Sequence, residues 1–227
     1  VVSHAMKDVL KELKIAESRI TVIPMGVDLR TRFVPAGQRP ATGTLLFVGR
    51  IVEKKGLKYL IEALPLVLEK HPNAVLRIVG DGPEKEKILD RILELGIAGH
   101  VEFFGAVANE ALTEIYHASD VVVFPSVVAG DGDREGFGLV LVEALGCGCA
   151  TVVTDLPAMR DIIVNGKSAL VVPEKNAGLI AEKINLLLED DNLRLALGEQ
   201  GRQYVLKRFD WEIIALQYKK LICSVIE

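Results

Sequence analysis

The chain has 227 residues, of which 50% are hydrophobic and only 5% aromatic, and its formal net charge is −4. This length suits one large domain with a substantial core, and the prevalence of Val, Ile, Leu and Ala is typical of a layered α/β protein. The slight acidity argues against nucleic-acid binding, and no apolar run approaches the ~20 residues of a membrane span or follows a charged leader, so membrane insertion and secretion lack support.

The opening residues predict a helix. Ser3 or His4 can cap its N-terminus, and apolar residues follow at helical spacing from Val9 to Leu13. Because the chain starts at Val1 instead of Met, in a pattern that resembles a strand end entering a helix, we expect the sequence to begin inside a longer protein.

A short strand and a linker are predicted next. Residues 20–24 are mostly β-branched and end at Pro24, which favours a strand. The following segment, up to Gly43, is rich in Pro, Gly and Arg, a composition that indicates a linker.

From Thr44 onward, strands and helices alternate. Short apolar runs bounded by Gly, Pro or Asp predict strands at residues 45–48, 75–79, 101–104, 121–124, 150–153 and 169–172. Apolar residues recur at helical spacing between these runs, and two further helices are predicted at about 193–207 and 211–226. The alternation predicts an α/β fold: a doubly wound parallel sheet of about six strands, with helices on both faces and two C-terminal helices.

Glycine-rich turns and polar residues gather where the predicted strands end. Ligands of a doubly wound sheet bind beyond the carboxyl ends of its strands, so this edge is the predicted site. The turns that follow the first five strands are Gly49-Arg50, Gly80-Asp81-Gly82-Pro83, Gly105, Pro125 to Gly138, and Thr154-Asp155.

Two glutamates are separated by seven residues. Every residue from Leu139 to Leu145 except Glu143 is apolar, so a helix there would carry one carboxylate into a buried setting, where it needs hydrogen-bond donors. Glu135 lies in a turn with Gly136 and Gly138. It could simply cap the helix, or the two glycines could leave backbone amides free to face an anion at the helix N-terminus.

A cationic loop follows the first strand of the sheet. Gly49-Arg50-Ile51-Val52-Glu53-Lys54-Lys55-Gly56 has a glycine at each end and three cations. Such a loop can cradle a diphosphate, because an Arg binds two oxygens at once and glycine permits close backbone approach. A solvated loop is the open alternative, although Arg50, directly after a buried strand, fits that alternative less well than Lys54.

The turn at Gly80–Glu84 invites comparison with a dinucleotide-binding fingerprint, since Glu102 lies about 20 residues further on. We reject this interpretation because Lys85 stands in place of the third glycine and Asp81 would repel a pyrophosphate. A tight turn in which Pro83 opens a helix explains these residues.

Other kinds of site are not indicated. The acidic loop Val127–Arg134 lacks a calcium-binding pattern and is interpreted as solvated. The histidines have no nucleophile elbow or metal motif around them. Cys147 and Cys149 are interpreted as small buried residues, and the odd total of three cysteines favours a reducing compartment.

Taken together, four features resemble the carboxy-terminal half of the retaining glycosyltransferases of family 4, which have the GT-B fold. They are the segment Val22–Asp28, Gly49-Arg50 with Lys55-Gly56, the turn at Gly80 and the Glu135–Glu143 pair. The resemblance covers nearly the whole chain. It implies that residues 1–39 are the end of an acceptor-binding domain and its hinge, that residues 40–208 form a Rossmann-like nucleotide-sugar-binding domain, and that residues 209–227 form a helix packing back toward the acceptor domain.

The resemblance also implies roles for single residues. Arg50 and Lys55 would hold the donor diphosphate, Glu143 the ribose hydroxyls and Glu135 the hexose hydroxyls, as a positioning acid and not a nucleophile. The catalytic set would be Glu135, Arg50 and Lys55. Further donor contacts would come from Gly49, Gly80, Val107, Gly136, Phe137, Gly138 and Leu139. No metal and no cofactor are implied, and the donor would be a UDP- or GDP-sugar.

The chain departs from the family pattern in two respects. After Thr154-Asp155 the usual glycine and glutamate are replaced, so we carry over no contact to Met159–Asp161. The family also draws catalytic contacts, including a histidine, from the amino-terminal domain that this chain lacks. We therefore expect the isolated domain to bind nucleotide but to transfer little sugar.

Two other functions stay open: a non-catalytic nucleotide- or sugar-sensing domain, and an NAD-dependent oxidoreductase domain, which the missing glycine disfavours. We expect a cytoplasmic protein that contacts the inner face of a membrane, if at all, through its missing half. The acceptor would likewise bind to that half.

Overall fold

Six short strands form one parallel sheet in the order β3-β2-β1-β4-β5-β6. In the computed structural model, which describes residues 1–37 and 41–226, all six predicted strands are confirmed. Their bounds are Thr44–Val48 (β1), Val75–Val79 (β2), Val101–Gly105 (β3), Val121–Phe124 (β4), Ala150–Thr154 (β5) and Leu170–Val172 (β6). This strand order is that of a doubly wound Rossmann-like sheet, as expected.

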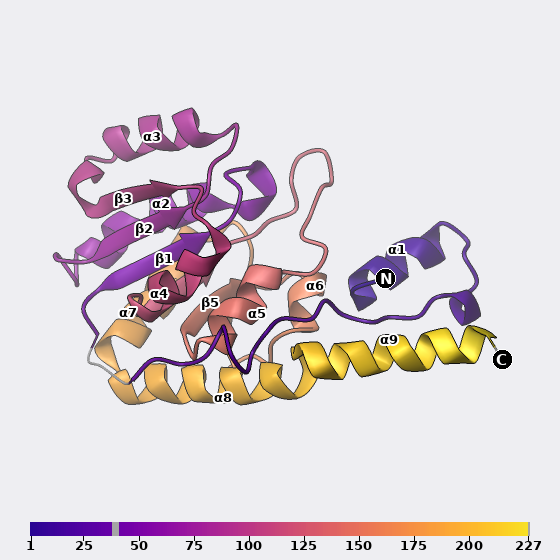
Figure 1. Ribbon diagram of the computed structural model, residues 1–227. Coiled ribbons are helices and arrows are strands. Elements are labelled where there is room, and N and C mark those ends of the chain that lie inside the picture. The colour runs from indigo at the N-terminus through magenta and orange to yellow at the C-terminus, as the bar shows by residue number, and fades with distance from the viewer. Residues whose placement is uncertain (38–40, 227) are drawn as a thin grey trace.

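Helices cover both faces of the sheet (Figure 1). Their bounds are His4–Glu12 (α1), Leu57–Leu68 (α2), Lys85–Glu94 (α3), Leu112–His117 (α4), Leu139–Gly146 (α5), Pro157–Arg160 (α6), Ala177–Glu189 (α7), Asp191–Phe209 (α8) and Trp211–Ile226 (α9). Leu45 and Phe47 of β1 belong to the core shared with α2, α3 and α7, whereas Leu46 and Val48 belong to the core shared with α4 and α5. Burial on both faces explains why the strands read as continuous apolar runs.

The strand expected at residues 20–24 is wrong. This segment is extended but joins no strand of the described chain. Its backbone forms isolated hydrogen bonds: Ile20 N donates to Glu17 O, Ile23 N donates to Val1 O, and the Val1 ammonium donates to Thr21 O, each at 3.0 Å. The β-branched residues favour extended backbone, but a strand also needs a neighbouring strand to complete its hydrogen bonds.

Part of the predicted linker packs firmly on the sheet domain. Val27 N donates to Phe209 O at 2.9 Å, next to the junction of α8 and α9. Leu29 and Phe33 are buried in the core beside α5, and an Arg202 Nη1 donates to Phe33 O at 2.8 Å. The predicted domain boundary between residues 39 and 40 lies outside the described residues, and the division into domains stays a prediction.

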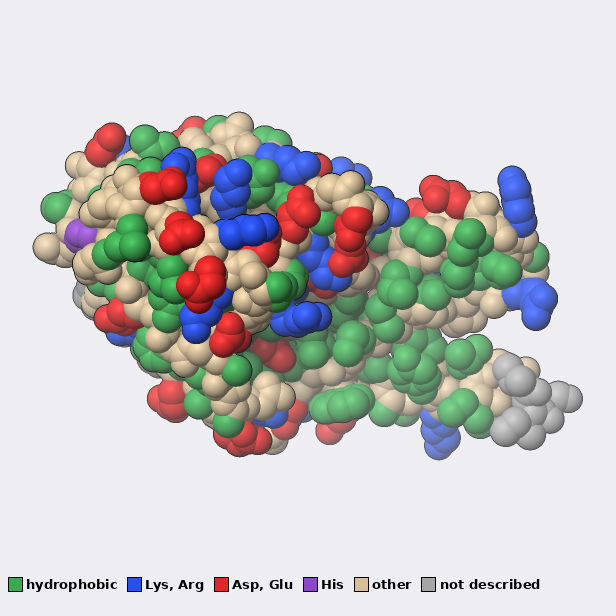
Figure 2. All heavy atoms as spheres, turned by 90° about the horizontal axis from the view of Figure 1, so that it is seen from above, with side chains coloured by type: hydrophobic (Ala, Val, Ile, Leu, Met, Phe, Trp, Pro, Cys, Tyr) green, Lys and Arg blue, Asp and Glu red, His purple; other side chains and the backbone are tan. Residues whose placement is uncertain are grey.

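Helices α1 and α9 project beyond the edge of the sheet domain (Figure 1), and apolar side chains gather over them (Figure 2). Exposed apolar residues in and near these helices are Met6, Leu13, Ile15, Met25, Trp211, Leu216, Tyr218 and Ile222. Among the described helices, none combines the length and the hydropathy that crossing a bilayer demands. The projecting arms therefore carry a larger share of exposed apolar surface than the sheet domain does.

Candidate functional site

The centre of the sheet is its topological switch point. β1 pairs with β2 on one side and with β4 on the other. The helix after β1, α2, joins one core, while the helix after β4, α5, joins the opposite core. The loops that leave β1 and β4 therefore diverge at the carboxyl ends of these strands, the place where doubly wound sheets bind ligands, and we call this place the crevice.

The turns after β1 and β2 interlock through their backbones. Gly49 N donates to Val79 O at 3.0 Å, and Ile51 N donates to Asp81 O at 2.9 Å. A Cβ on Gly80 would stand 1.9 Å from Gly49 O, and one on Gly82 would stand 2.3 Å from Ile51 O. The turn at Gly80 is thus a tight turn required by packing, which removes the main reason for comparing it with a dinucleotide fingerprint.

The cationic loop after β1 is tied to the acidic loop after β4. Lys55 Nζ contacts Glu135 Oε2, and the two side chains are only 18% and 14% exposed. Lys54 Nζ lies 2.9 Å from Asp133 Oδ2, and Gly130 N donates to Glu53 Oε1 at 3.0 Å. The tip of the acidic loop is exposed, as expected, yet it is anchored by these contacts and is not freely solvated.

The two predicted cations have different surroundings. Lys55 is paired and largely buried, whereas the side chain of Arg50 is exposed and forms no hydrogen bond or ion pair with any residue in the described part of the chain. Its guanidinium is therefore open to an external anion at the mouth of the crevice. Gly49 lies against Lys55, with 3.5 Å between a Cβ built on the glycine and Lys55 Cδ.

Glu135 is held as a carboxylate. Burial alone would raise its pKa, but the charge and hydrogen bond of Lys55, with a smaller contribution from Lys54, more than compensate, so the pKa lies below its ordinary value. Gly136 N also donates to Glu135 Oε1 at 3.2 Å. The geometry places an ionised acid beside a cation at the carboxyl ends of β1 and β4.

The first turn of α5 follows this acid. Its N-cap is Gly138, at φ 96°, a left-handed conformation that glycine adopts without strain. None of the described side chains caps this helix end, so the amides that precede Leu141 can face an anion, whereas Leu141 N already donates to Gly138 O at 3.0 Å. Phe137 is buried in the core beneath, while Leu139 is half-buried.

Glu143 lies inside α5, one turn further along, and is 6% exposed. Tyr116 Oη donates to Glu143 Oε2 at 3.2 Å and to Val140 O at 3.3 Å. Burial raises the pKa of Glu143, and the Tyr116 hydroxyl and the Arg32 charge offset this only in part. The expected burial is confirmed, and the protein itself supplies one of the donors that the carboxylate needs.

Sequence reasoning missed Tyr116 and Arg32. One Nη of Arg32 is buried with no hydrogen-bond partner among the described residues, and the guanidinium carbon lies 4.9 Å from the centre of the Phe33 ring. No local pattern around Tyr116 or Arg32 signals that they converge on Glu143.

Val107, in the loop after β3, is half-buried and packs against the core that also holds Phe137.

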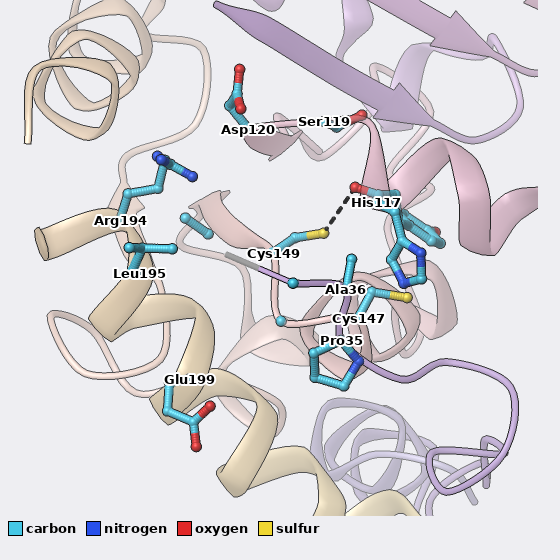
Figure 3. A pocket seen from close by; sticks show the side chains of 14 residues that line it. Pro35, Ala36, His117, Ser119, Asp120, Cys147, Cys149, Arg194, Leu195 and Glu199 are labelled. Carbon is cyan, nitrogen blue, oxygen red and sulfur yellow. Dashed lines mark hydrogen bonds between the residues drawn. The ribbon is translucent and has the colours of Figure 1, made fainter. Parts of the chain in front are cut away.

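A second hollow, of about 180 Å³, lies at the opposite end of the sheet, where β4 and β5 begin (Figure 3). Asp120 Oδ2 accepts hydrogen bonds from Thr42 N and Thr44 N, each at 2.8 Å, which anchors the chain as it enters β1. Cys147 and Cys149 are buried, as expected, and burial raises the pKa of the Cys147 thiol, which disfavours the reactive thiolate. We assign this end a structural role.

The described residues include no cluster of three His, Cys, Asp or Glu side chains arranged for a metal ion. The expectation that no metal is needed stays a prediction. The crevice at β1 and β4 combines two acids, Glu135 and Glu143, two cations, Arg50 and Lys55, and the N-terminus of α5.

Comparison with known proteins gives a consistent result. The model of the family "Glycosyl transferases group 1" matches residues 33–204. A GDP-mannose-dependent alpha-(1-6)-phosphatidylinositol monomannoside mannosyltransferase of Mycobacterium tuberculosis is 32% identical over 189 residues, which are 83% of this chain and 48% of that protein. The chain spans about half the length of the curated relatives it matches.

Two solved structures resemble the fold. The C-terminal domain of a glycosyl transferase group 1 family protein from Francisella tularensis has a TM-score of 0.72 at 28% identity and covers 82% of this chain and 100% of that one. The Anabaena protein HepE in complex with UDP has a TM-score of 0.86 at 22% identity and covers 98% of this chain and 62% of that one. At such identity the second likeness concerns the fold alone.

Proposed function

The chain belongs to the glycosyl transferases of group 1, and from this premise we propose that it is the donor-binding half of a retaining enzyme that transfers a hexose from a nucleoside diphosphate sugar to an acceptor hydroxyl. The observation that carries the proposal is the contact of Lys55 with Glu135 at the carboxyl ends of β1 and β4. A sugar nucleotide needs a cation for its diphosphate and an acceptor of hydrogen bonds for its hydroxyls. This pair offers both within one contact.

The diphosphate would lie between three positive groups. Lys55 and the exposed Arg50 supply full charges, and the Gly138 amide at the start of α5 supplies a partial one, while the Phe137 amide would face the sugar. These groups would stabilise the charge that develops on the departing nucleotide. Because they can substitute for a metal ion, we propose a metal-independent reaction without a cofactor.

The two ends of the donor would meet the two acids. Glu135 would accept hydrogen bonds from the hexose hydroxyls, and Glu143 from the ribose hydroxyls. The base would lie near Val107, in the loop after β3, and Gly49, Gly80, Gly136 and Leu139 would line the crevice with backbone. The GDP-mannose dependence of the mycobacterial relative and the UDP in the HepE complex support a UDP- or GDP-sugar without deciding between them.

Glu135 would act by positioning. In the proposed reaction the bond from the anomeric carbon to the diphosphate breaks, its electron pair stays on the phosphate oxygen, and the acceptor hydroxyl attacks on the same face. The acceptor proton passes to the departing phosphate, so no enzyme nucleophile is required. An ionised Glu135, held by Lys55, can orient the hexose throughout this exchange.

We also propose that a preceding domain binds the acceptor. The chain spans about half the length of its relatives, and its exposed apolar surface gathers on α1 and α9. That surface is suited to packing against another domain. A cytoplasmic location, with membrane contact only through the preceding domain, completes the proposal.

Calorimetric titration of the 227-residue chain tests donor binding, since the Francisella domain was crystallised without the rest of its protein. UDP, GDP and ADP, their sugar forms and NAD are the ligands. We expect one nucleotide series to bind, and Arg50→Ala to weaken it roughly tenfold or more through the loss of a charged contact. Lys58→Ala, on an exposed side chain of α2, is the matched control and should change nothing.

Binding of NAD alone would overturn the proposal. Binding of none of these ligands would also overturn it, and would favour a domain that binds no sugar donor. Retention of the anomeric configuration is tested on the full-length protein, by determining the configuration of the product by NMR. Inversion at the anomeric carbon, or loss of transfer in EDTA, would contradict the mechanism.

A further inference from the structure

The first turn of α1 reaches directly into the loop that precedes α5. Ser3 Oγ donates a hydrogen bond to Gly136 O at 2.6 Å, across 133 residues of sequence, and Ser3 is fully buried. The same hydroxyl accepts a hydrogen bond from Met6 N at 3.2 Å, so it also caps α1. One side chain therefore begins a helix and restrains the loop of Glu135.

A second contact holds the same turn of α1. His4 N donates to Asp161 Oδ2 at 2.7 Å, and the Nδ1 atom of His4 lies 3.1 Å from Asp161 Oδ1. Asp161 follows α6, whose Met159 packs against Gly138, with 2.9 Å between Met159 Cε and a Cβ built on the glycine. Helix α1 thus engages both segments that surround the N-terminus of α5.

These polar contacts matter because α1 has little other hold on the sheet domain. None of its residues is buried, and Val2 and Ala5 pack only partly against the core. The stretch Glu135–Gly138 that it touches contains two glycines, and glycine permits many backbone conformations. An external hydrogen bond is what can select one of them.

The planarity of the peptide group gives the bond to Gly136 a consequence for the crevice. The Gly136 carbonyl and the Phe137 N–H belong to one rigid trans peptide and point in opposite directions. Because the carbonyl points to Ser3 on α1, the Phe137 N–H points away from α1. Fixing the carbonyl therefore fixes the direction of an amide beside Glu135.

We propose that Ser3 is a positioning residue for the hexose of the donor: its hydroxyl orients the Gly136–Phe137 peptide, so that the Phe137 amide and the Glu135 carboxylate meet the sugar in a fixed geometry. The inference rests on the proposed donor site and adds a residue from outside the sheet domain. Through Ser3, a displacement of α1 would change sugar binding while leaving the nucleotide end untouched.

Ser3→Gly in the full-length protein tests this, since glycine is tolerated at an N-cap at a cost of only a few tenths of a kcal/mol and lacks the hydroxyl. We expect affinity for the nucleoside diphosphate sugar to fall about two- to tenfold, the range for one hydrogen bond. Affinity for the nucleoside diphosphate alone should change less than about twofold. Ser3→Thr, which keeps a hydroxyl, should recover the sugar-dependent part.

Asp190→Gly is the matched control, because Asp190 caps α8 by accepting a hydrogen bond from Leu193 N at 2.9 Å, at the opposite end of the sheet from the loop of Glu135. It should lower stability through the loss of a helix cap and leave both affinities unchanged. Equal losses for diphosphate and sugar nucleotide in Ser3→Gly, or no loss for either, would overturn the role of Ser3 while leaving the proposed donor site standing. Failure of the unaltered protein to bind any sugar nucleotide would overturn both.

Discussion

Glu135 and Glu143 are the same residue type in one short motif, yet their surroundings shift their acidity in opposite directions. Glu135 lies in a loop against the ammonium of Lys55, and its pKa is lowered. Glu143 lies inside α5 against the neutral hydroxyl of Tyr116, and its pKa is raised. Burial pushes both pKa values up, so the kind of partner, and not burial, separates the two acids.

This difference in partners fits different roles for the two acids in the crevice. An acid that stays ionised beside a lysine can exchange its contact with the lysine for contacts with a ligand. An acid enclosed in a helix is better suited to a fixed geometry, because its neighbours cannot move without disturbing the core. Four experiments test whether the partners of the two acids account for this difference.

Lys55→Ala should have the largest effect. We expect nucleotide affinity to fall roughly ten- to a hundredfold, since a charged hydrogen-bonded contact contributes about 1.5–3 kcal/mol. The pKa of Glu135 should rise at the same time, because burial loses its main opposing charge, and Glu135 would then resemble Glu143. Calorimetry and a carboxyl NMR titration measure the two effects. An unchanged pKa of Glu135 would show that Lys55 does not set its acidity.

Tyr116→Phe should come next, with a loss of about 1–3 kcal/mol in the free energy of unfolding, because a buried carboxylate loses a donor. The ring packing against Phe33, with centroids 6.2 Å apart, is retained. Urea unfolding at pH 7 measures the change, and Tyr218→Phe on exposed α9 is the control. Equal stability of Tyr116→Phe and the control would mean that the hydroxyl contributes nothing to holding Glu143.

The pH dependence of stability should have opposite signs for the two acids. Because the folded pKa of Glu135 is lowered, its charge stabilises the fold above the unfolded pKa, and this contribution disappears as pH falls through the folded pKa. Because the folded pKa of Glu143 is raised, its charge destabilises the fold above that pKa, and acid relieves the cost.

Glu135→Gln should therefore be less stable than the unaltered protein at neutral pH and approach it in acid. Glu143→Gln should gain stability relative to the unaltered protein as pH rises. Urea unfolding from pH 3 to 7 records both curves. The same sign for both substitutions would contradict the assigned shifts.

Arg32→Met should have the smallest effect, below about 1 kcal/mol in stability, since Arg32 is partly exposed and acts on Glu143 at a distance. The pKa of Glu143 should rise further, because one of the two groups that lower it is gone. A carboxyl NMR titration detects this shift, with Arg19→Met on a remote exposed site as control. A lowered pKa would show that Arg32 does not favour the charged form.

The sheet and its crevice could be predicted because their signals are local. Each strand is a short apolar run between residues that break regular structure. The apolar run of α5 contains one polar residue, Glu143, and its burial could be predicted from its apolar neighbours. The strand expected at residues 20–24 shows the limit of this reasoning. Extended backbone is a property of the residues themselves, whereas a strand depends on a partner elsewhere in the chain.

The residues that were missed act over long sequence distances. Tyr116 is 27 residues from Glu143, and Ser3 is 133 residues from Gly136. Tyr116 lies in no glycine turn, strand end or charge cluster, the features that pointed to Arg50, Lys55 and Glu135, and Ser3 was predicted only as a possible helix cap. Only the fold reveals such side chains, because it decides which helices face one another.

The burial of Leu29 and Phe33 has a consequence for anyone who recombines domains of this family. A chain that began at residue 41 would keep every strand of the sheet, but it would lose two side chains that are 0% and 3% exposed. At roughly 1.5–3 kcal/mol for each, about 3–6 kcal/mol together, that loss is comparable with the lower end of the stability of a typical domain, about 5–15 kcal/mol. A viable graft of the donor half onto a foreign partner should therefore carry the segment that wraps it.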